Sequence, residues 1–125
     1  MPIPPALPPF EREVMERVWE RGSTPARAVL DDLNANPSHA PRAYTTILTI
    51  LRRLEVKGLV TRERGPRADV YAPAIDRDAY LRDRADAEVD DVIAAYGEHA
   101  LAQFVRHAEG LDPERRAALR RLAGE

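Results

Sequence analysis

The sequence predicts a mainly α-helical protein that contains one small β-hairpin and ends in a further run of helices. Over most of the chain, apolar residues recur every three or four positions, the period of a helix with one buried face. After Gly58 the pattern alternates instead, and a Gly-Pro turn interrupts it, as in a hairpin. Charge also differs along the chain: residues 1–73 contain 11 Lys/Arg and 9 Asp/Glu, whereas residues 74–125 contain 8 and 12. We therefore expect two parts with different roles.

Residues 1–9 are rich in proline and are expected to form a flexible lead. A first helix is predicted over Phe10–Arg21, and Gly22 ends it because glycine is common directly after a helix. We expect Trp19 to lie in the core between the first and third helices. The full apolar stripe of the first helix is Phe10, Val14, Met15, Val18 and Trp19.

A second helix follows, for which Thr24 is predicted as the N-cap and Pro25 as the first helical residue. A polar loop over residues 34–41 then leads to a third helix over residues 43–57, which Gly58 ends. In the second helix, the residues expected to face inward are Ala28, Val29 and Leu33.

The third helix carries two different faces. Its apolar stripe is expected to join the core and consists of Ile47, Ile50, Leu51 and Leu54. Short hydroxyl side chains occupy its first turns, and cations follow further along. Short groups let a helix backbone approach base edges, and cations reach phosphates, so this pattern indicates entry into a nucleic-acid groove.

Two strands are predicted after the third helix, over residues 59–64 and 68–72, joined by an arginine-rich Gly-Pro turn. Three helices followed by a hairpin is the order of a winged helix-turn-helix, in which the helix before the hairpin is the recognition helix. We assign residues 10–74 to such a DNA-binding domain. Between Arg42 and Arg67 there are seven cations and two carboxylates, a local charge of +5.

Three more helices are predicted in the acidic part of the chain. The first runs over residues 76–95, the second over residues 99–108, and the third begins at Pro113 with Asp112 as its N-cap. Their apolar stripes are narrow and carry no evident site. We therefore interpret residues 75–125 as a helical dimerisation domain.

The composition excludes several classes of protein. There is no cysteine, which rules out disulfides and thiolate chemistry and fits a cytoplasmic protein. No apolar run approaches the ~20 residues that span a bilayer. The three histidines, His39, His99 and His107, are too dispersed for a metal site. Because no catalytic triad, phosphate loop or carboxylate pair stands out, we expect no cofactor and no enzymatic activity.

Three segments of the sequence resemble the BlaI/MecI/CopY family of bacterial transcriptional repressors. They are E-V-M-E-R-V-W-E-R-G, then A-Y-T-T-I-L-T-I-L-R-R-L-E-V-K-G-L-V, then V-Y-A-P at the end of the hairpin. The resemblance is specific over Phe10–Pro73 and weaker beyond. It implies a homodimer on a palindromic double-stranded DNA operator, with one recognition helix per half-site, and the repression of genes such as those for β-lactam resistance or copper handling.

The resemblance also bears on how DNA is released. The copper branch of the family carries a C-terminal cysteine motif, which this chain lacks. The β-lactam branch is cut by a regulatory protease in the dimerisation domain, just before a phenylalanine that follows an asparagine. Gln103 and Phe104 stand at the matching place, with glutamine instead of asparagine.

Nine residues are predicted to contact DNA. Three threonines of the third helix face bases or phosphates, although Thr45 or Thr46 alternatively caps the helix. Arg52 and Arg53 reach phosphates, or alternatively belong to a solvated face or pair with Glu55; Arg53 is favoured because it shares a face with the threonines. The full set is Arg42, Thr45, Thr46, Thr49, Arg52, Arg53, Arg62, Arg64 and Arg67.

Two alternative functions use the same fold. The first alternative is a protein–protein interaction module in which the acidic helices bind a partner. The second alternative is a DNA-binding regulator that senses a small molecule between the winged domain and the C-terminal helices. Binding to duplex DNA distinguishes the first alternative, and thermal stabilisation by a ligand distinguishes the second.

Overall fold

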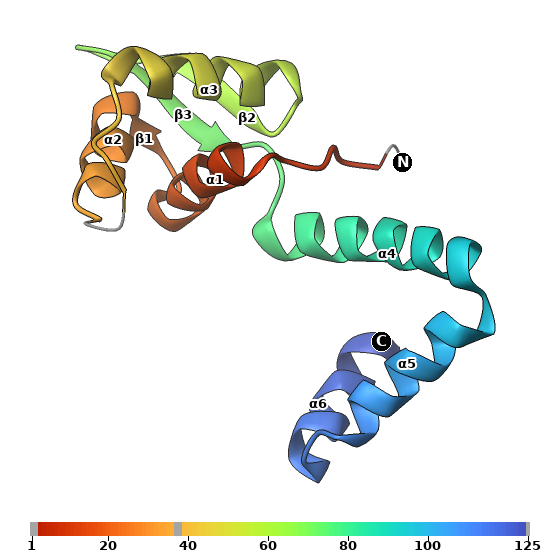
Figure 1. The fold of residues 1–125 in the computed structure, drawn as a ribbon. Helices are drawn as coiled ribbons and strands as arrows, with labels where there is room; N and C mark the ends of the chain where they lie inside the picture. Colours follow the sequence, from red (N-terminus) through yellow and green to blue (C-terminus); the bar gives the residue numbers. More distant parts are fainter. Residues whose placement is uncertain (1–2, 37–38, 125) are drawn as a thin grey trace. The chain divides into compact units, whose positions relative to one another are not determined.

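The computed structural model describes residues 3–36 and 39–124, and apart from one additional short strand its elements follow the predicted order (Figure 1). The helices are α1 (Pro9–Arg21), α2 (Ala26–Asn34), α3 (Tyr44–Val56), α4 (Arg77–Tyr96), α5 (Glu98–Glu109) and α6 (Pro113–Gly124), and the strands are β1 (Thr24–Pro25), β2 (Val60–Arg64) and β3 (Asp69–Pro73). The chain forms two compact units, which divide between Arg84 and Ala85. Within the first unit, α1, α2, α3 and the sheet make a winged helix, which confirms the predicted fold class.

The core of the first unit is formed by the apolar faces of its three helices. Helix α3 packs against both α1 and α2, and β2 lies beside it. The predicted stripe of α3 is confirmed, since its four members are all buried. Fully buried side chains include Val14, Met15, Val18, Val29, Ile47, Leu51, Leu54, Tyr71 and Tyr80.

The prediction that Thr24 caps the second helix is wrong. Thr24 instead forms β1 with Pro25 and pairs with Tyr71 of β3, so the sheet has three strands in the order β1-β3-β2. Its hydroxyl donates to the carbonyl oxygen of Pro25 at 2.9 Å, and Pro25 itself is the N-cap of α2. The Thr24 side chain is fully buried, so the residue belongs to the core of the first unit.

The end of α3 is fixed by glycine, as predicted. Gly58 has φ +80°, a conformation that side chains disfavour. The Leu59 N–H donates to the Leu54 carbonyl at 2.9 Å across this turn, which is the pairing of a Schellman motif. The chain therefore reverses directly from α3 into the hairpin, so that α3 and β2 stand next to each other.

The beginning of α4 belongs to the first unit. The Tyr80 ring is buried and lies 5.4 Å from the Trp19 ring, centroid to centroid. Trp19 is only partly buried, at the edge of the core, and its indole N–H donates to the Ile75 carbonyl at 2.9 Å. The tryptophan therefore holds the segment between β3 and α4, a role that the helical stripe did not reveal.

The described part of the N-terminal lead lies against the same helix. The Tyr80 hydroxyl donates to the Pro5 carbonyl at 2.8 Å, and the Arg84 guanidinium donates to the Pro4 carbonyl at 3.1 Å. Pro4 is buried and Leu7 packs on the core. The lead was expected to be flexible; these contacts hold residues 4 to 7 in place, while the first two residues of the prediction lie outside the described range.

The second unit consists of the rest of α4 together with α5 and α6. Gly97, with φ +60°, separates α4 from α5. Asp112 caps α6 as predicted, because its carboxylate accepts from the Arg115 N–H at 2.8 Å. Ala100 is the one residue of α5 and α6 that is buried, among the residues that the structure describes.

Candidate nucleic-acid interface

The outer face of α3 is polar and open to solvent. Of its predicted contact residues, Thr45, Thr46, Thr49, Arg52 and Arg53 are all exposed. They lie opposite the buried stripe, so the fold presents them together. Helix α3 can therefore bring small hydroxyl groups and cations to a groove at the same time.

The threonines do not cap the helix. Ala43 is the N-cap of α3, and no side chain among the described residues forms a capping hydrogen bond to this helix. The Thr49 hydroxyl donates to the Thr45 carbonyl at 2.9 Å, which leaves its oxygen lone pairs outward as acceptors. The alternative that Thr45 or Thr46 is merely a capping residue is excluded. Uncapped N–H groups at a helix N-terminus also favour phosphate binding.

The loop before α3 is held by Asn34 of α2. Its side-chain oxygen accepts from the Arg42 N–H at 2.7 Å, and its amide donates to the Arg42 carbonyl at 3.1 Å. The Arg42 guanidinium lies 4.3 Å from the Phe10 ring centroid, on the side of α1. The loop thereby fixes the start of α3, although two of its residues, 37 and 38, lie outside the described range.

Arg27 is a cation of this surface that the sequence did not reveal. It belongs to α2 and lies 5.9 Å from the ring centroid of Tyr44, the first residue of α3. Both side chains are exposed. The pairing depends on the angle between the two helices, so no local pattern in the sequence could have indicated it.

The three wing arginines lie in different environments. Arg62 of β2 is 3.5 Å from a carboxylate oxygen of Glu55 and 3.5 Å from one of Asp69. It therefore joins the wing to α3. Arg64 and Arg67 are exposed and form no ion pair within residues 3–36 and 39–124. Their position beside the Gly65 turn leaves them available to an external anion.

The C-terminal turn of α3 is tied to α1 by a buried carboxylate. Glu11 accepts from the Lys57 ammonium at 2.6 Å, and its other oxygen lies 3.9 Å from the Arg53 guanidinium. The Glu11 side chain is only 8% exposed. Glu55, which the sequence offered as the partner of Arg52 or Arg53, pairs with Arg62 instead. A shallow groove of about 450 Å³ runs over the outer side of this turn, lined by Thr49, Arg52, Arg53, Val56 and Lys57.

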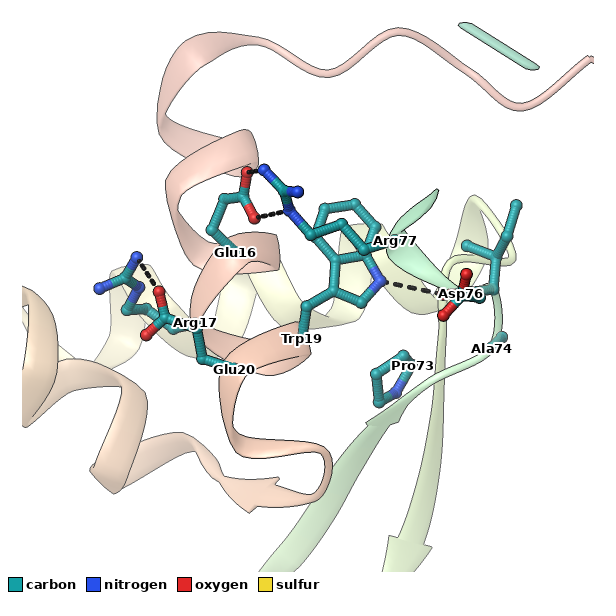
Figure 2. Close-up of a pocket in the computed structure, with 9 residues that line it drawn as sticks. Glu16, Arg17, Trp19, Glu20, Pro73, Ala74, Asp76 and Arg77 are labelled. Carbon is teal, nitrogen blue, oxygen red and sulfur yellow. Dashed lines mark hydrogen bonds and ion pairs between the residues drawn. The ribbon is translucent and has the colours of Figure 1, made fainter. Parts of the chain in front are cut away.

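A second depression, of about 830 Å³, lies between α1 and the segment that joins β3 to α4 (Figure 2). Figure 2 shows Glu16 and Arg77 facing each other across it, with guanidinium-to-carboxylate distances of 2.7 and 3.1 Å. The hydrogen bond from Arg77, opposed by desolvation, holds the pKa of Glu16 below its ordinary value. Arg17 and Glu20 also pair, at 2.7 Å. These ion pairs are structural and lie apart from the face of α3.

Gln103 and Phe104 lie within α5. Both are exposed, and 42% of Phe104 is accessible to solvent. The bond between them is part of a regular helix, so a protease that reads extended chain needs α5 to open locally.

Within residues 3–36 and 39–124, no group of three or more His, Asp or Glu side chains is placed to hold a metal ion. In the same part of the chain, no helix is both long enough and apolar enough to span a membrane.

The chain is similar to known transcriptional regulators along most of its length. The profile of the penicillinase repressor family matches residues 7–125. The transcriptional regulator BlaI of Mycobacterium tuberculosis is 37% identical over 120 residues, which cover 92% of this chain and 84% of that protein. The penicillinase repressor of Bacillus licheniformis is 32% identical over 77 residues, or 62% of this chain and 58% of that protein.

A solved structure agrees over the winged helix. The DNA-binding domain of the repressor BlaI is 33% identical, with a TM-score of 0.50, and the match covers 63% of this chain and 92% of that domain. The relatives are transcriptional repressors and not enzymes, as the sequence predicted. The chain therefore belongs to the penicillinase repressor family and is a BlaI-like transcriptional repressor with a winged-helix DNA-binding fold.

Proposed function

We propose that the protein is a cytoplasmic homodimer that represses transcription by binding a palindromic operator, with α3 of each protomer in the major groove of one half-site. The observation that carries this proposal is the division of α3 into a buried apolar stripe and an exposed face of threonines and arginines. Helices of this kind read base edges with short side chains while flanking cations hold the backbone.

Within this proposal the contact residues divide by role. Thr45, Thr46 and Thr49 face base edges, because they are short, exposed and at the start of the helix. Phosphates are held by Arg42, Arg52 and Arg53 around α3 and by Arg64 and Arg67 in the wing. Arg62 contributes mainly by fixing the wing, because it already has two carboxylate partners.

Dimerisation is supported by the surface of the second unit. Apolar side chains remain exposed on each of its helices, and a monomer gains nothing from exposing so many of them in 41 residues. The exposed set comprises Val89, Val92, Tyr96, Leu101, Phe104, Val105, Leu119 and Leu122. A second copy of the same unit would bury them, which fits the isologous interfaces of most homodimers.

Fluorescence anisotropy with duplex DNA from the promoter of its own gene tests the proposal. We expect tight binding to that duplex and binding at least ~1000-fold weaker to a scrambled duplex of equal length. Equal affinity for both duplexes would contradict a sequence-specific repressor. No salt-dependent binding to either would favour a protein–protein module instead.

Replacement of Thr46 by alanine tests the assignment of base contacts. We expect Thr46→Ala to reduce the discrimination between operator and scrambled duplex by ~1–3 kcal/mol, because a hydrogen bond to a base edge is lost. Affinity for the scrambled duplex should stay unchanged. A parallel loss on both duplexes would instead assign Thr46 to a phosphate.

A further inference from the structure

Glu11 is the one carboxylate that is buried among the residues that the structure describes, and it lies directly behind the candidate DNA-binding face. It belongs to the first turn of α1, where the helix dipole favours a negative charge. Its partner, Lys57, follows the last residue of α3. The Nζ-to-Oε1 distance of 2.6 Å is that of a short, charge-assisted hydrogen bond.

Position 57 differs from every other cationic position of the chain because it carries a lysine. Lys57 is the single lysine of the sequence, and every other cationic side chain is arginine. A compact ammonium can reach a mostly buried oxygen end-on, whereas a planar guanidinium spreads its donors over a wider fork. The Lys57 side chain is only 30% exposed, against 61% for Arg53 one turn earlier. Arg53 is therefore much more accessible to solvent than Lys57, although both lie on the same surface.

Both cations line the groove on the outer side of α3, next to Thr49. A free ammonium there would attract the phosphates of any DNA, regardless of sequence. Glu11 cancels the charge of Lys57 at short range, whereas Arg53 lies 3.9 Å away and remains mostly exposed. The effect is to remove one non-specific phosphate contact while leaving the threonines untouched.

We propose that Glu11 is a specificity-determining residue: by holding Lys57, it withholds that ammonium from phosphates and so suppresses binding to non-operator DNA. The inference rests on the proposed function, because it requires that the exposed face of α3 binds DNA. A purely structural tie between α1 and α3 would behave differently. Its loss would lower stability and would weaken binding to operator and non-operator DNA alike.

The test compares Glu11→Gln with Glu13→Gln. Both changes remove one negative charge from α1, but Glu13 is exposed two residues away. We expect Glu11→Gln to tighten binding to a scrambled duplex roughly fivefold at ~0.1 M salt and to steepen the salt slope by ~0.9, the value for one added phosphate contact. Operator affinity should rise less, so the specificity ratio falls. Glu13→Gln should change each affinity by less than about twofold, since exposed charges at a distance are screened.

A double variant identifies the cation responsible. Glu11→Gln with Lys57→Met should return non-operator affinity and the salt slope to their wild-type values, because the released ammonium is gone. Persistence of the gain in the double variant would overturn the proposal, as would equal effects of Glu11→Gln and Glu13→Gln. Urea unfolding of each variant establishes that the native fold is present under the assay conditions.

An NMR measurement on the wild-type protein tests the role of Lys57 without any substitution, so it applies even if Glu11→Gln does not fold. Because there is one lysine, protein made with 13Cε-lysine gives a single lysine side-chain resonance. Saturation with scrambled duplex should leave this resonance in place in the wild type. A large displacement would show that Lys57 already contacts phosphate and would overturn the proposal.

The outcomes separate the two levels of inference. If the wild type does not distinguish operator from scrambled duplex, the proposed function fails. If the wild type discriminates, but Glu11→Gln lowers or leaves unchanged its affinity for scrambled DNA, the role of Glu11 fails while the repressor function stands.

Discussion

At the scale of single residues, the structure separates cations that can bind DNA from cations that hold the fold. Seven cations lie between Arg42 and Arg67, and the sequence alone treats them as one basic patch. Two of them, Lys57 and Arg62, have carboxylate partners within 3.5 Å. A cation that is already paired with a carboxylate contributes little to phosphate binding. Fewer than seven of these cations are therefore available to DNA.

Two wing arginines provide a direct comparison. Arg64→Ala should weaken binding to operator and scrambled duplex alike and flatten the salt slope by ~0.9, because one phosphate contact is lost. Arg62→Ala should change the slope less and lower stability instead, since it leaves Glu55 and Asp69 without their partner. Salt titrations monitored by anisotropy measure the slopes. A larger slope change for Arg62→Ala would reverse these two roles.

The lowered pKa of Glu16 makes the free energy of unfolding depend on pH. The Arg77 guanidinium lowers the pKa of Glu16 from its ordinary 4.5, so the folded state binds this proton less readily than the unfolded chain does. The stabilisation is therefore fully present above pH ~4.5 and is lost as the pH falls through the lower, folded-state pKa. Urea unfolding at several pH values should show that wild type loses its advantage over Glu16→Gln as the pH falls below the ordinary value of 4.5. A difference that does not change with pH would contradict the ion pair.

At the scale of elements, the N-terminal lead and the start of α4 support each other. Pro4 is buried, and the carbonyls of Pro4 and Pro5 accept hydrogen bonds from Arg84 and Tyr80. Together with the contact between the Trp19 and Tyr80 rings, which are tilted at 50° to each other, these hydrogen bonds make the first two turns of α4 part of the winged unit. The first compact unit therefore extends beyond the hairpin into α4, as far as Arg84.

Deletion of residues 1–7 tests whether the N-terminal lead supports the winged unit. We expect the winged unit to lose ~1–3 kcal/mol of stability, because buried apolar area and two hydrogen bonds disappear. Tyr80→Phe removes one of these bonds and should cost ~0.5–1.5 kcal/mol in the full chain. In the truncated chain the same substitution should cost less, because Pro5 is absent. Strictly additive losses in chemical unfolding would argue that the lead makes no specific contact.

At the scale of the whole molecule, the two units differ in how complete they are. The first unit has a closed core, whereas the second unit exposes apolar side chains on α4, α5 and α6. Leu101, Phe104 and Val105 follow the i, i+3, i+4 spacing, so they form one stripe on α5. Such a stripe in a short three-helix unit is what a symmetric dimer requires.

Replacing Phe104 by aspartate should dissociate the proposed dimer, because a charge would enter its apolar interface. Sedimentation should then report monomers at concentrations where the wild type is dimeric. Operator affinity should fall by at least ~100-fold, whereas affinity for an isolated half-site should not change. Gln103→Asp, with the same charge change at the neighbouring position of α5, provides the control. Monomers in the wild type would contradict the dimer itself.

Local features of the sequence predict the order and type of every helix and of the hairpin strands, but not of β1. The apolar period of α3, its ending at Gly58 and the turn of the wing are local features, and each is confirmed. The predicted contact residues Thr45, Thr46, Thr49, Arg52, Arg53, Arg64 and Arg67 are indeed exposed, because a helix that buries one stripe must expose the opposite one. Their contacts with DNA remain a proposal.

Which distant residues come into contact depends on how the elements pack. The local sequence predicts that Thr24 caps a helix, but Thr24 pairs with Tyr71 of β3 as part of a third strand. Glu11 and Lys57, 46 positions apart, meet only because α1 crosses the end of α3. The same holds for Tyr80 with Pro5 and for Arg62 with Glu55. Periodicity reports which face of an element is buried, whereas long-range pairing depends on how the elements pack, which no local pattern contains.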